Sequence, residues 1–246
     1  MNWEHLNELR SLSDKGRDEE ALSELRVLLG GSAAPEERAA VLVTIAVPLK
    51  NLGRFSDARE VIAEARNLVR TNSETYAWIL LGDAGLDVNE GKWKDALKKF
   101  DAILSGFPAL FQKPENRETL DDIQRKRGVA LAGLDRCDEA RPLLERTASQ
   151  DHDEQGLVLY CLGKCYYKSG AYEKARQSLR QALSVHLDPD YQVDARYHLG
   201  LTYYRLHQTA WAIQEFERCL EGDAGSGVPR DYILKAKALA EQERTS

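Results

Sequence analysis

The sequence is poor in cysteine and has no long apolar segment. Its 246 residues include four cysteines, too few and too scattered for the disulfide framework of a small secreted domain. The longest uncharged apolar run, residues 39–49, is about half as long as a membrane-spanning helix and contains Pro48. The N-terminal residues carry charges where a signal peptide would be apolar. We therefore expect a protein of a reducing, cytoplasmic compartment with no membrane partner.

An excess of positive charge is also missing. The chain has 34 Lys and Arg against 40 Asp and Glu, a net charge of −6, and neither end carries a charged tail. Binding to nucleic acid therefore has no overall electrostatic support. Hydrophobic residues make up 43% and charged residues 30%, which is typical of a folded soluble protein rather than a disordered one. We expect no nucleic-acid partner.

No group of residues has the pattern of a catalytic or metal site. The five histidines lack metalloprotease spacing and have no nucleophile beside them in the sequence. Cys161 and Cys165 could share a helical face, but zinc needs more ligands than two. The glycine-rich segment 222–229 lacks the Lys-Ser/Thr ending of a phosphate-binding loop. The sequence therefore predicts no enzyme, no metal and no cofactor.

What the sequence does contain is an internal repeat. Gly163 and Ala175 are twelve residues apart, with a turn at residues 169–170 between them. The related pairs are Leu9 and Ala21, Ala46 and Ala58, Gly82 and Ala96 with two additional residues, Gly128 and Ala140, and Gly200 and Ala212. The alanines step by 35 to 44 residues, and a repeat of this length is typical of stacked helical pairs.

Each unit is predicted to form two amphipathic helices. In the fifth unit, Leu159, Leu162 and Tyr166 follow the i, i+3, i+7 spacing of an apolar stripe. A glycine such as Gly170 after a polar helix end is a common stop signal. Small residues at the paired positions let two helices approach closely. One pair cannot bury its apolar face alone, so the pairs are expected to stack.

The units resemble the tetratricopeptide repeat, with the pattern W-x2-L-G-x2-Y, then A-x3-F, then A. The matching residues are Leu159, Leu162, Gly163, Tyr166, Ala175, Leu179 and Ala182 in the fifth unit, Trp78, Leu81, Gly82, Ala96, Phe100 and Ile103 in the third, and Leu199, Gly200, Tyr203, Ala212, Phe216 and Cys219 in the sixth. Cys165 and Cys219 stand where the repeat usually has alanine, so they are expected to pack as small apolar residues.

The resemblance implies an all-α fold, a right-handed α-solenoid of about six helical hairpins plus a C-terminal capping helix. The predicted repeats of this single solenoid, residues 1–246, are about 2–35, 39–72, 75–109, 115–153, 156–189 and 193–224, with the cap at 229–243. An insertion at 106–118 carries Phe107, Leu110 and Phe111. It is interpreted either as a loop packed on the solenoid or as a binding flap.

In this family the first helix of each pair lines a concave surface, where partners usually bind. The corresponding positions are basic and rich in tyrosine in the second half of the chain. The candidate residues are Arg125, Lys126, Tyr160, Lys164, Tyr167, Lys168, Tyr197, His198, Tyr204 and Arg205. Tyrosine and arginine are strong peptide anchors, and lysine attracts carboxylates. The alternative is that the tyrosines only belong to the repeat pattern.

We therefore expect a non-catalytic scaffold that captures a protein or peptide segment, acidic and apolar in character, in its concave groove. The first alternative is self-assembly into a homodimer through an exposed apolar edge at Trp3 and Leu6. The second is a small-ligand sensor, marked by a closed pocket between the 106–118 insertion and the inner helices.

Overall fold

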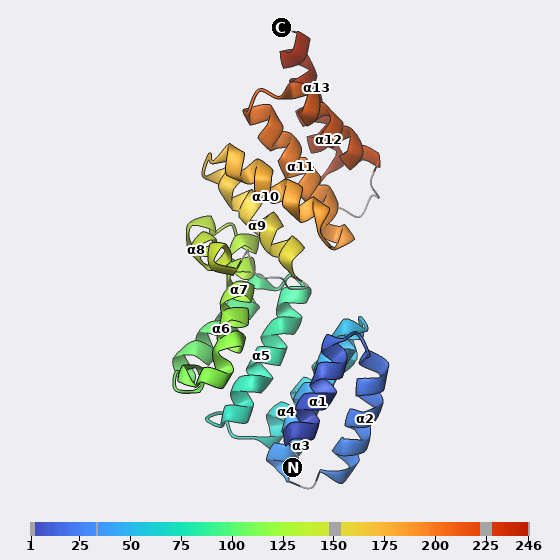
Figure 1. Cartoon of the computed structure of the whole chain (residues 1–246), viewed down its shortest axis with the longest axis vertical. Helices are drawn as coiled ribbons and strands as arrows, with labels where there is room; N and C mark the ends of the chain where they lie inside the picture. Colours follow the sequence, from blue (N-terminus) through green and yellow to red (C-terminus); the bar gives the residue numbers. More distant parts are fainter. Residues whose placement is uncertain (1–2, 33, 148–153, 222–227, 246) are drawn as a thin grey trace. The chain divides into compact units, whose positions relative to one another are not determined.

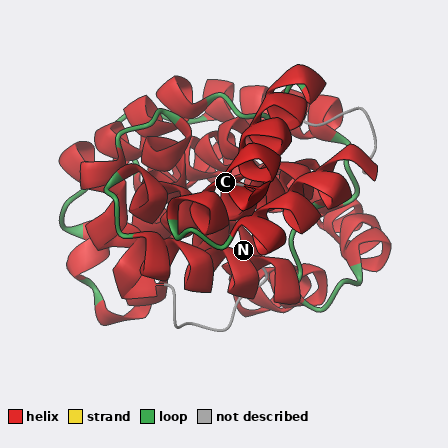
Figure 2. Ribbon diagram, turned by 90° about the horizontal axis from the view of Figure 1, so that it is seen from above, coloured by secondary structure: helices red, strands yellow, loops and turns green. Residues whose placement is uncertain are grey.

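The computed structural model of the chain describes residues 3–32, 34–147, 154–221 and 228–245. Within these ranges the regular structure is entirely helical, with no strand, which confirms the predicted all-α class (Figures 1 and 2). The α-helices are α1 (Trp3–Asp14), α2 (Asp18–Gly31), α3 (Pro35–Asn51), α4 (Phe55–Leu68), α5 (Glu74–Asn89), α6 (Trp93–Gly106), α7 (Arg117–Gly133), α8 (Cys137–Thr147), α9 (Gln155–Lys168), α10 (Tyr172–Ser184), α11 (Pro189–Arg205), α12 (Thr209–Glu221) and α13 (Arg230–Thr245). None of these helices is long and apolar enough to cross a bilayer.

The chain divides into two compact units, Met1–Ile123 and Gln124–Ser246, whose boundary falls inside α7. In unit 1, α1 packs on α2, α3 on α4 and α5 on α6, and each pair contacts the next. In unit 2, α9 packs on α10 and α11 on α12, and α13 covers α12. The predicted hairpins are thus present in both units, whereas one continuous solenoid over residues 1–246 stays a prediction.

All six hairpin turns contain one residue in the left-handed backbone region. It lies five residues before the alanine of each unit and is Gly16, Gly53, Gly91, Asp135, Gly170 or His207. Since glycine adopts this conformation without steric cost, four glycines fit the turn directly. The constant spacing corrects the predicted register of the third unit. Ala84, not Gly82, is the partner of Ala96, so no residues are inserted there.

The corrected register places two carboxylates at apolar positions of the repeat. Asp83 and Asp87 stand where the fifth unit has Leu162 and Tyr166, and they are only 5% and 2% exposed. Burying a charge costs free energy unless it is paired. Here each carboxylate is paired: Arg59 donates to both, at 2.6 Å.

Cations from both neighbouring helices complete this network. Arg66 of α4 binds Asp83, and the amine of Lys99 on α6 lies 2.9 Å from the Asp83 carboxylate and also binds Asp87. Burial raises the pKa of Asp83, but the hydrogen bonds and charges of Lys99 and Arg66 outweigh it, so the pKa lies below its ordinary value. The core of unit 1 therefore includes an ionic cluster that joins α4, α5 and α6.

Glycines bring the helices of unit 2 together as predicted. A Cβ on Gly163 would lie 2.5 Å from Leu179 of α10, and one on Gly200 would lie 2.5 Å from Phe216 of α12. On α7, a Cβ at Gly128 would meet Leu144 of α8 at 2.9 Å. These distances are shorter than van der Waals contact, so the interlocking of the helices depends on the missing side chain.

The 106–118 insertion packs on α5 within unit 1. Leu110 and Phe111 lie in a short 3-10 helix and are buried, and the Phe111 ring meets Trp78 of α5 edge to face at a centroid distance of 6.4 Å. Lys113 forms an ion pair with Glu74 at 2.8 Å. Of the two interpretations of this segment, the contacts support the packed loop.

Helix α13, the predicted capping helix, carries exposed apolar side chains. Ile233 and Ala240 of α13 are buried, but Tyr232, Leu234 and Leu239 are 54%, 48% and 53% exposed. At the other end of the chain, Leu6 is buried in the core of unit 1, so it does not form the exposed apolar edge that we expected there. The side chain of Trp3 lies outside the described part of the structure.

Candidate partner-binding surface

Eight of the ten candidate residues lie on two first helices that contact each other, α9 and α11. We call this set the α9–α11 surface. It consists of Tyr160, Lys164, Tyr167 and Lys168 of α9 and Tyr197, His198, Tyr204 and Arg205 of α11. Residues on one face of a helix recur every three or four positions, so the candidate residues of each helix lie along the same side of that helix. The structure thus brings these sequence candidates together.

A polar network beneath the surface holds the two helices in register. Tyr160 is only 5% exposed, and its hydroxyl donates to the carboxylate of Asp194 on α11. The Nδ1 atom of His198 lies 3.1 Å from the other Asp194 oxygen and 2.9 Å from the Asp194 carbonyl. Tyr160 therefore links α9 to α11 from within and is not an exposed anchor.

The environment of Asp194 favours its charged form. Burial raises the pKa of this carboxyl, yet the hydrogen bonds from His198 and Tyr160 outweigh burial and lower it below the ordinary value. Burial also raises the pKa of Tyr160 far above its usual range. Asp194 is thus an anion that accepts hydrogen bonds and orients the His198 ring.

Aromatic rings surround His198 on the α9–α11 surface. The imidazole meets Tyr160, Tyr167 and Tyr197 edge to face, at centroid distances of 6.4, 6.2 and 5.7 Å. Tyr167 also packs against Tyr172 at 5.7 Å. Tyr167, Tyr197 and His198 are each half-buried. The result is a fixed aromatic patch with polar ring edges, a type of surface that suits peptide side chains.

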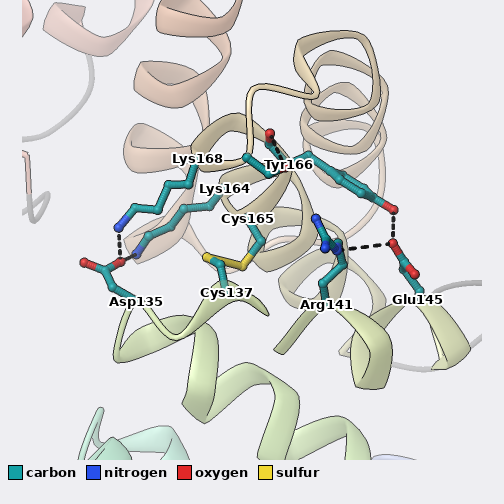
Figure 3. Close-up of a disulfide and its surroundings, with 9 residues drawn as sticks. Asp135, Cys137, Arg141, Glu145, Lys164, Cys165, Tyr166 and Lys168 are labelled. Carbon is teal, nitrogen blue, oxygen red and sulfur yellow. Dashed lines mark hydrogen bonds and ion pairs between the residues drawn. A yellow bond between two sulfur atoms is a disulfide. The ribbon is translucent and has the colours of Figure 1, made fainter. Parts of the chain in front are cut away.

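The cationic side chains of the surface already form ion pairs or hydrogen bonds within the protein. Lys164 and Lys168 lie 3.7 and 2.6 Å from a carboxylate oxygen of Asp135, in the turn between α7 and α8 (Figure 3). Arg205 is exposed, and its hydrogen bond with Tyr167 raises its pKa. The two remaining candidates, Arg125 and Lys126 of α7, pair with Glu154 at 3.3 and 3.7 Å. An acidic partner would have to replace these carboxylates.

One covalent link was missed by the sequence interpretation. Cys165 is buried, as expected for a small packed residue, but its sulfur forms a disulfide with Cys137 at the start of α8 (Figure 3). The prediction that Cys165 only packs as a small apolar residue is therefore wrong. Cys161 and Cys219 remain free thiols, and burial raises the pKa of each to about 12.

A cavity of about 640 Å³ opens between α8, α9 and α10. Leu159, Leu162 and Tyr166 of α9 line it together with Lys174 and Gln177 of α10. Tyr166 donates to Glu145 at 2.9 Å beside it. The residues that line this cavity do not include any residue of the 106–118 insertion, beside which a sensor pocket was expected.

Comparison with known proteins agrees with the geometry. The sequence model of the tetratricopeptide repeat family matches residues 154–224. No curated protein sequence matches the chain. Among solved structures, the chain is similar to the apo form of the quorum sensor NprR from B. thuringiensis, with a TM-score of 0.56 and 18% identity over 99% of this chain and 69% of that one.

Two further solved structures share the fold. NprR in complex with its cognate peptide NprX has a TM-score of 0.55 and 18% identity, over 99% of this chain and 71% of that one. The APC/C hetero-tetramer Cut9–Hcn1 has a TM-score of 0.60 and 16% identity, over 96% of this chain but only 42% of that one. At these identities the likeness establishes the fold alone.

The helical pairs, their turns and the family match define a scaffold of stacked helix–turn–helix repeats. The family model identifies residues 154–224 as tetratricopeptide repeats, which confirms the resemblance found in the sequence for the fifth and sixth units. This fold supports a role in protein–protein interaction, and proteins of this class generally act as scaffolds rather than catalysts.

Proposed function

We propose that this chain is a non-catalytic, cytoplasmic binding module that captures a segment of a partner protein on the α9–α11 surface. The observation that carries the proposal is the aromatic patch around His198, fixed from beneath by Tyr160 and Asp194 and flanked by Lys164, Lys168 and Arg205. The similarity to a peptide-bound quorum sensor is consistent with this role.

The aromatic rings are expected to provide more of the affinity than the cations. Tyr167 and Tyr197 are held by neighbouring rings, so little conformational entropy is lost when a partner contacts them. Each exposed ion pair contributes only about 0–1 kcal/mol, and here a partner's carboxylate only replaces one already present. The cations therefore select for acidic segments and speed their association, and apolar side chains of the partner pack on the rings.

Reversing the charge of Lys164, Lys168 and Arg205 should weaken partner binding and reduce its salt dependence. Binders would first be selected from a random peptide library with the wild-type protein, and their Kd values measured by fluorescence anisotropy over a series of salt concentrations. The triple Glu variant should bind the acidic binders at least about tenfold more weakly, because attraction is replaced by repulsion at three positions.

A matched control makes the same change of charge elsewhere. Arg10, Lys94 and Lys98 are exposed residues of unit 1, and their replacement by Glu alters the net charge equally. This control variant should bind like the wild type. Equal weakening by both triple variants would show that only net charge matters, and the assignment of the α9–α11 surface would be wrong.

Self-association is the second candidate function, and the exposed apolar residues of α13 favour it. Tyr232 and Leu239 are seven positions apart and share one side of α13, whereas Leu234 lies on the other side, and all three side chains are about half exposed. If the side of α13 with Tyr232 and Leu239 binds a second copy, the molar mass measured by light scattering should rise with protein concentration, and the Tyr232→Glu, Leu239→Glu double variant should stay monomeric. A wild-type mass that stays at 27.7 kDa over the series would contradict this candidate.

A further inference from the structure

The disulfide lies directly beside the ion pairs of the α9–α11 surface. Cys137 is the first residue of α8 and follows Asp135 by two positions, and Cys165 stands between Lys164 and Lys168 on α9 (Figure 3). The same two segments are thus joined twice. One link is covalent, between Cys137 and Cys165, and the other is ionic, between Asp135 and the two lysines.

The environment of the two cysteines is that of a reactive pair. Cys137 is partly exposed and occupies the N-terminus of an eleven-residue helix, where the backbone N–H groups stabilise a thiolate. Cys165 is buried, and the two Cα atoms are 5.0 Å apart. An accessible cysteine at a helix N-terminus next to a second cysteine is the arrangement of redox-sensing pairs, and disulfides of cytoplasmic proteins are mostly of that kind.

The ion pairs of Asp135 are too exposed to fix the turn between α7 and α8 by themselves. The Asp135 side chain is 59% exposed, and those of Lys168 and Lys164 are 40% and 19% exposed. Exposed pairs of this kind contribute little to stability and are readily exchanged. The disulfide changes this balance, because it anchors the chain two residues from Asp135 and keeps the carboxylate at a high effective concentration beside the lysines.

We propose that Cys137 and Cys165 form a thiol–disulfide site that controls whether Lys164 and Lys168 are available to an acidic partner. In the oxidised state the tethered carboxylate of Asp135 occupies both lysines and competes with the partner. In the reduced state the turn at residues 134–136 is released from its covalent anchor, and a carboxylate of the partner displaces Asp135 more easily. This inference rests on the proposed function of the α9–α11 surface.

The reductant is a low-molecular-weight thiol, and the exchange is balanced. Its thiolate attacks Sγ of Cys137, the more accessible sulfur; the S–S bond breaks, and Cys165 leaves as a thiolate that takes up a proton. A second reductant thiolate then attacks the reductant sulfur of the mixed disulfide. This step releases Cys137 as a thiolate, which also takes up a proton, and leaves the oxidised reductant, so two electrons and two protons have entered the protein.

The test measures binding of one defined probe by both redox states. A fluorescein-labelled peptide of alternating Glu and Leu is titrated with the full-length protein in buffers of oxidised or reduced glutathione, and the thiols are counted by alkylation and mass measurement. Reduction should free Cys137 and Cys165 and lower the Kd by up to about fivefold, which is the scale of one exposed ion pair. Cys137→Ser should bind like the reduced wild type in both buffers.

Asp135→Asn separates the proposed cause from other effects of the disulfide. Without the competing carboxylate, the variant should bind tightly in both buffers, and the redox difference should vanish while its disulfide still forms. Cys219→Ala, which removes a buried free thiol, is the matched control and should keep the wild-type response.

The outcomes distinguish the two proposals. If the probe binds with the same Kd in both redox states, or if Asp135→Asn keeps the redox difference, the control by Asp135 is wrong although the surface still binds. A cysteine pair that stays oxidised in reduced glutathione overturns the control as well. If neither redox state binds acidic peptides, the proposed function fails, and this inference fails with it.

Discussion

Replacing Asp83 by asparagine should destabilise unit 1 by about 3 kcal/mol, the scale reported for removing one partner of a buried ion pair. Asparagine keeps the shape of the side chain but removes the charge that compensates Arg59, Arg66 and Lys99. These cations then remain close to one another with less negative charge between them. Little of the loss can be regained by relaxation, because Asp83 is buried in the middle of α5.

The matched control is Asp57→Asn in the same unit. Asp57 also binds an arginine, Arg54, but its side chain is 44% exposed, so the variant should lose at most about 1 kcal/mol. Urea unfolding followed by circular dichroism and tryptophan fluorescence compares the two. If both variants unfold at the same urea concentration, the buried cluster does not stabilise unit 1 more than a surface pair does.

The effect of Asp83→Asn should also depend on pH. The folded pKa of Asp83 is depressed, so its contribution is complete above the unfolded pKa of about 4 and is lost as the pH falls through the lower folded pKa. The difference in the free energy of unfolding between wild type and variant should therefore be largest at neutral pH and shrink below about pH 4.

The position of Asp83 shows what the sequence predicts correctly, the repeat, and what it does not, the register of the third unit. The repeat was found from alanine spacing, because a small residue at a close helix crossing is needed in every unit. The register of the third unit was wrong because Gly82 looked like the glycine of the pattern. The left-handed turn residue Gly91 shows that Ala84 occupies that position, and the burial of Asp83 and Asp87 shows that both side chains lie in the core.

For a similar reason, only part of the arrangement of the candidate residues could be predicted from the sequence. Periodicity placed Tyr167, Tyr197 and His198 on the correct helices, since each helix determines its own faces. Periodicity could not reveal the contacts made across units. Asp135 belongs to the turn of the preceding hairpin and Asp194 to α11 of the next hairpin, and their pairing with α9 depends on how the hairpins stack. The Cys137–Cys165 disulfide was missed on the same ground, because its two halves lie 28 residues apart on different hairpins.

A second stacking contact concerns Gly156, in the first turn of α9. A Cβ built on this glycine would lie 2.1 Å from the carbonyl oxygen of His186 and 3.1 Å from Cα of Leu187. At Gly163 and Gly200 the nearest atoms belong to side chains, which can turn aside, whereas here they belong to the backbone. The segment after α10 would have to move away as a whole, and Leu187, which is buried, would lose its packing.

Gly156→Ala should therefore destabilise unit 2 by about 3 kcal/mol or more, the upper range for overpacking, although alanine is the better helix former. The matched control is Gly85→Ala on α5, where a Cβ meets nothing within 4 Å. That variant should gain up to about 1 kcal/mol from helix propensity. Urea unfolding should therefore show a lower free energy of unfolding for Gly156→Ala and a higher one for Gly85→Ala than for the wild type. Stabilisation by both substitutions would mean that α9 does not approach residues 186–187 this closely, and the contact between α9 and the end of α10 would have to be redrawn.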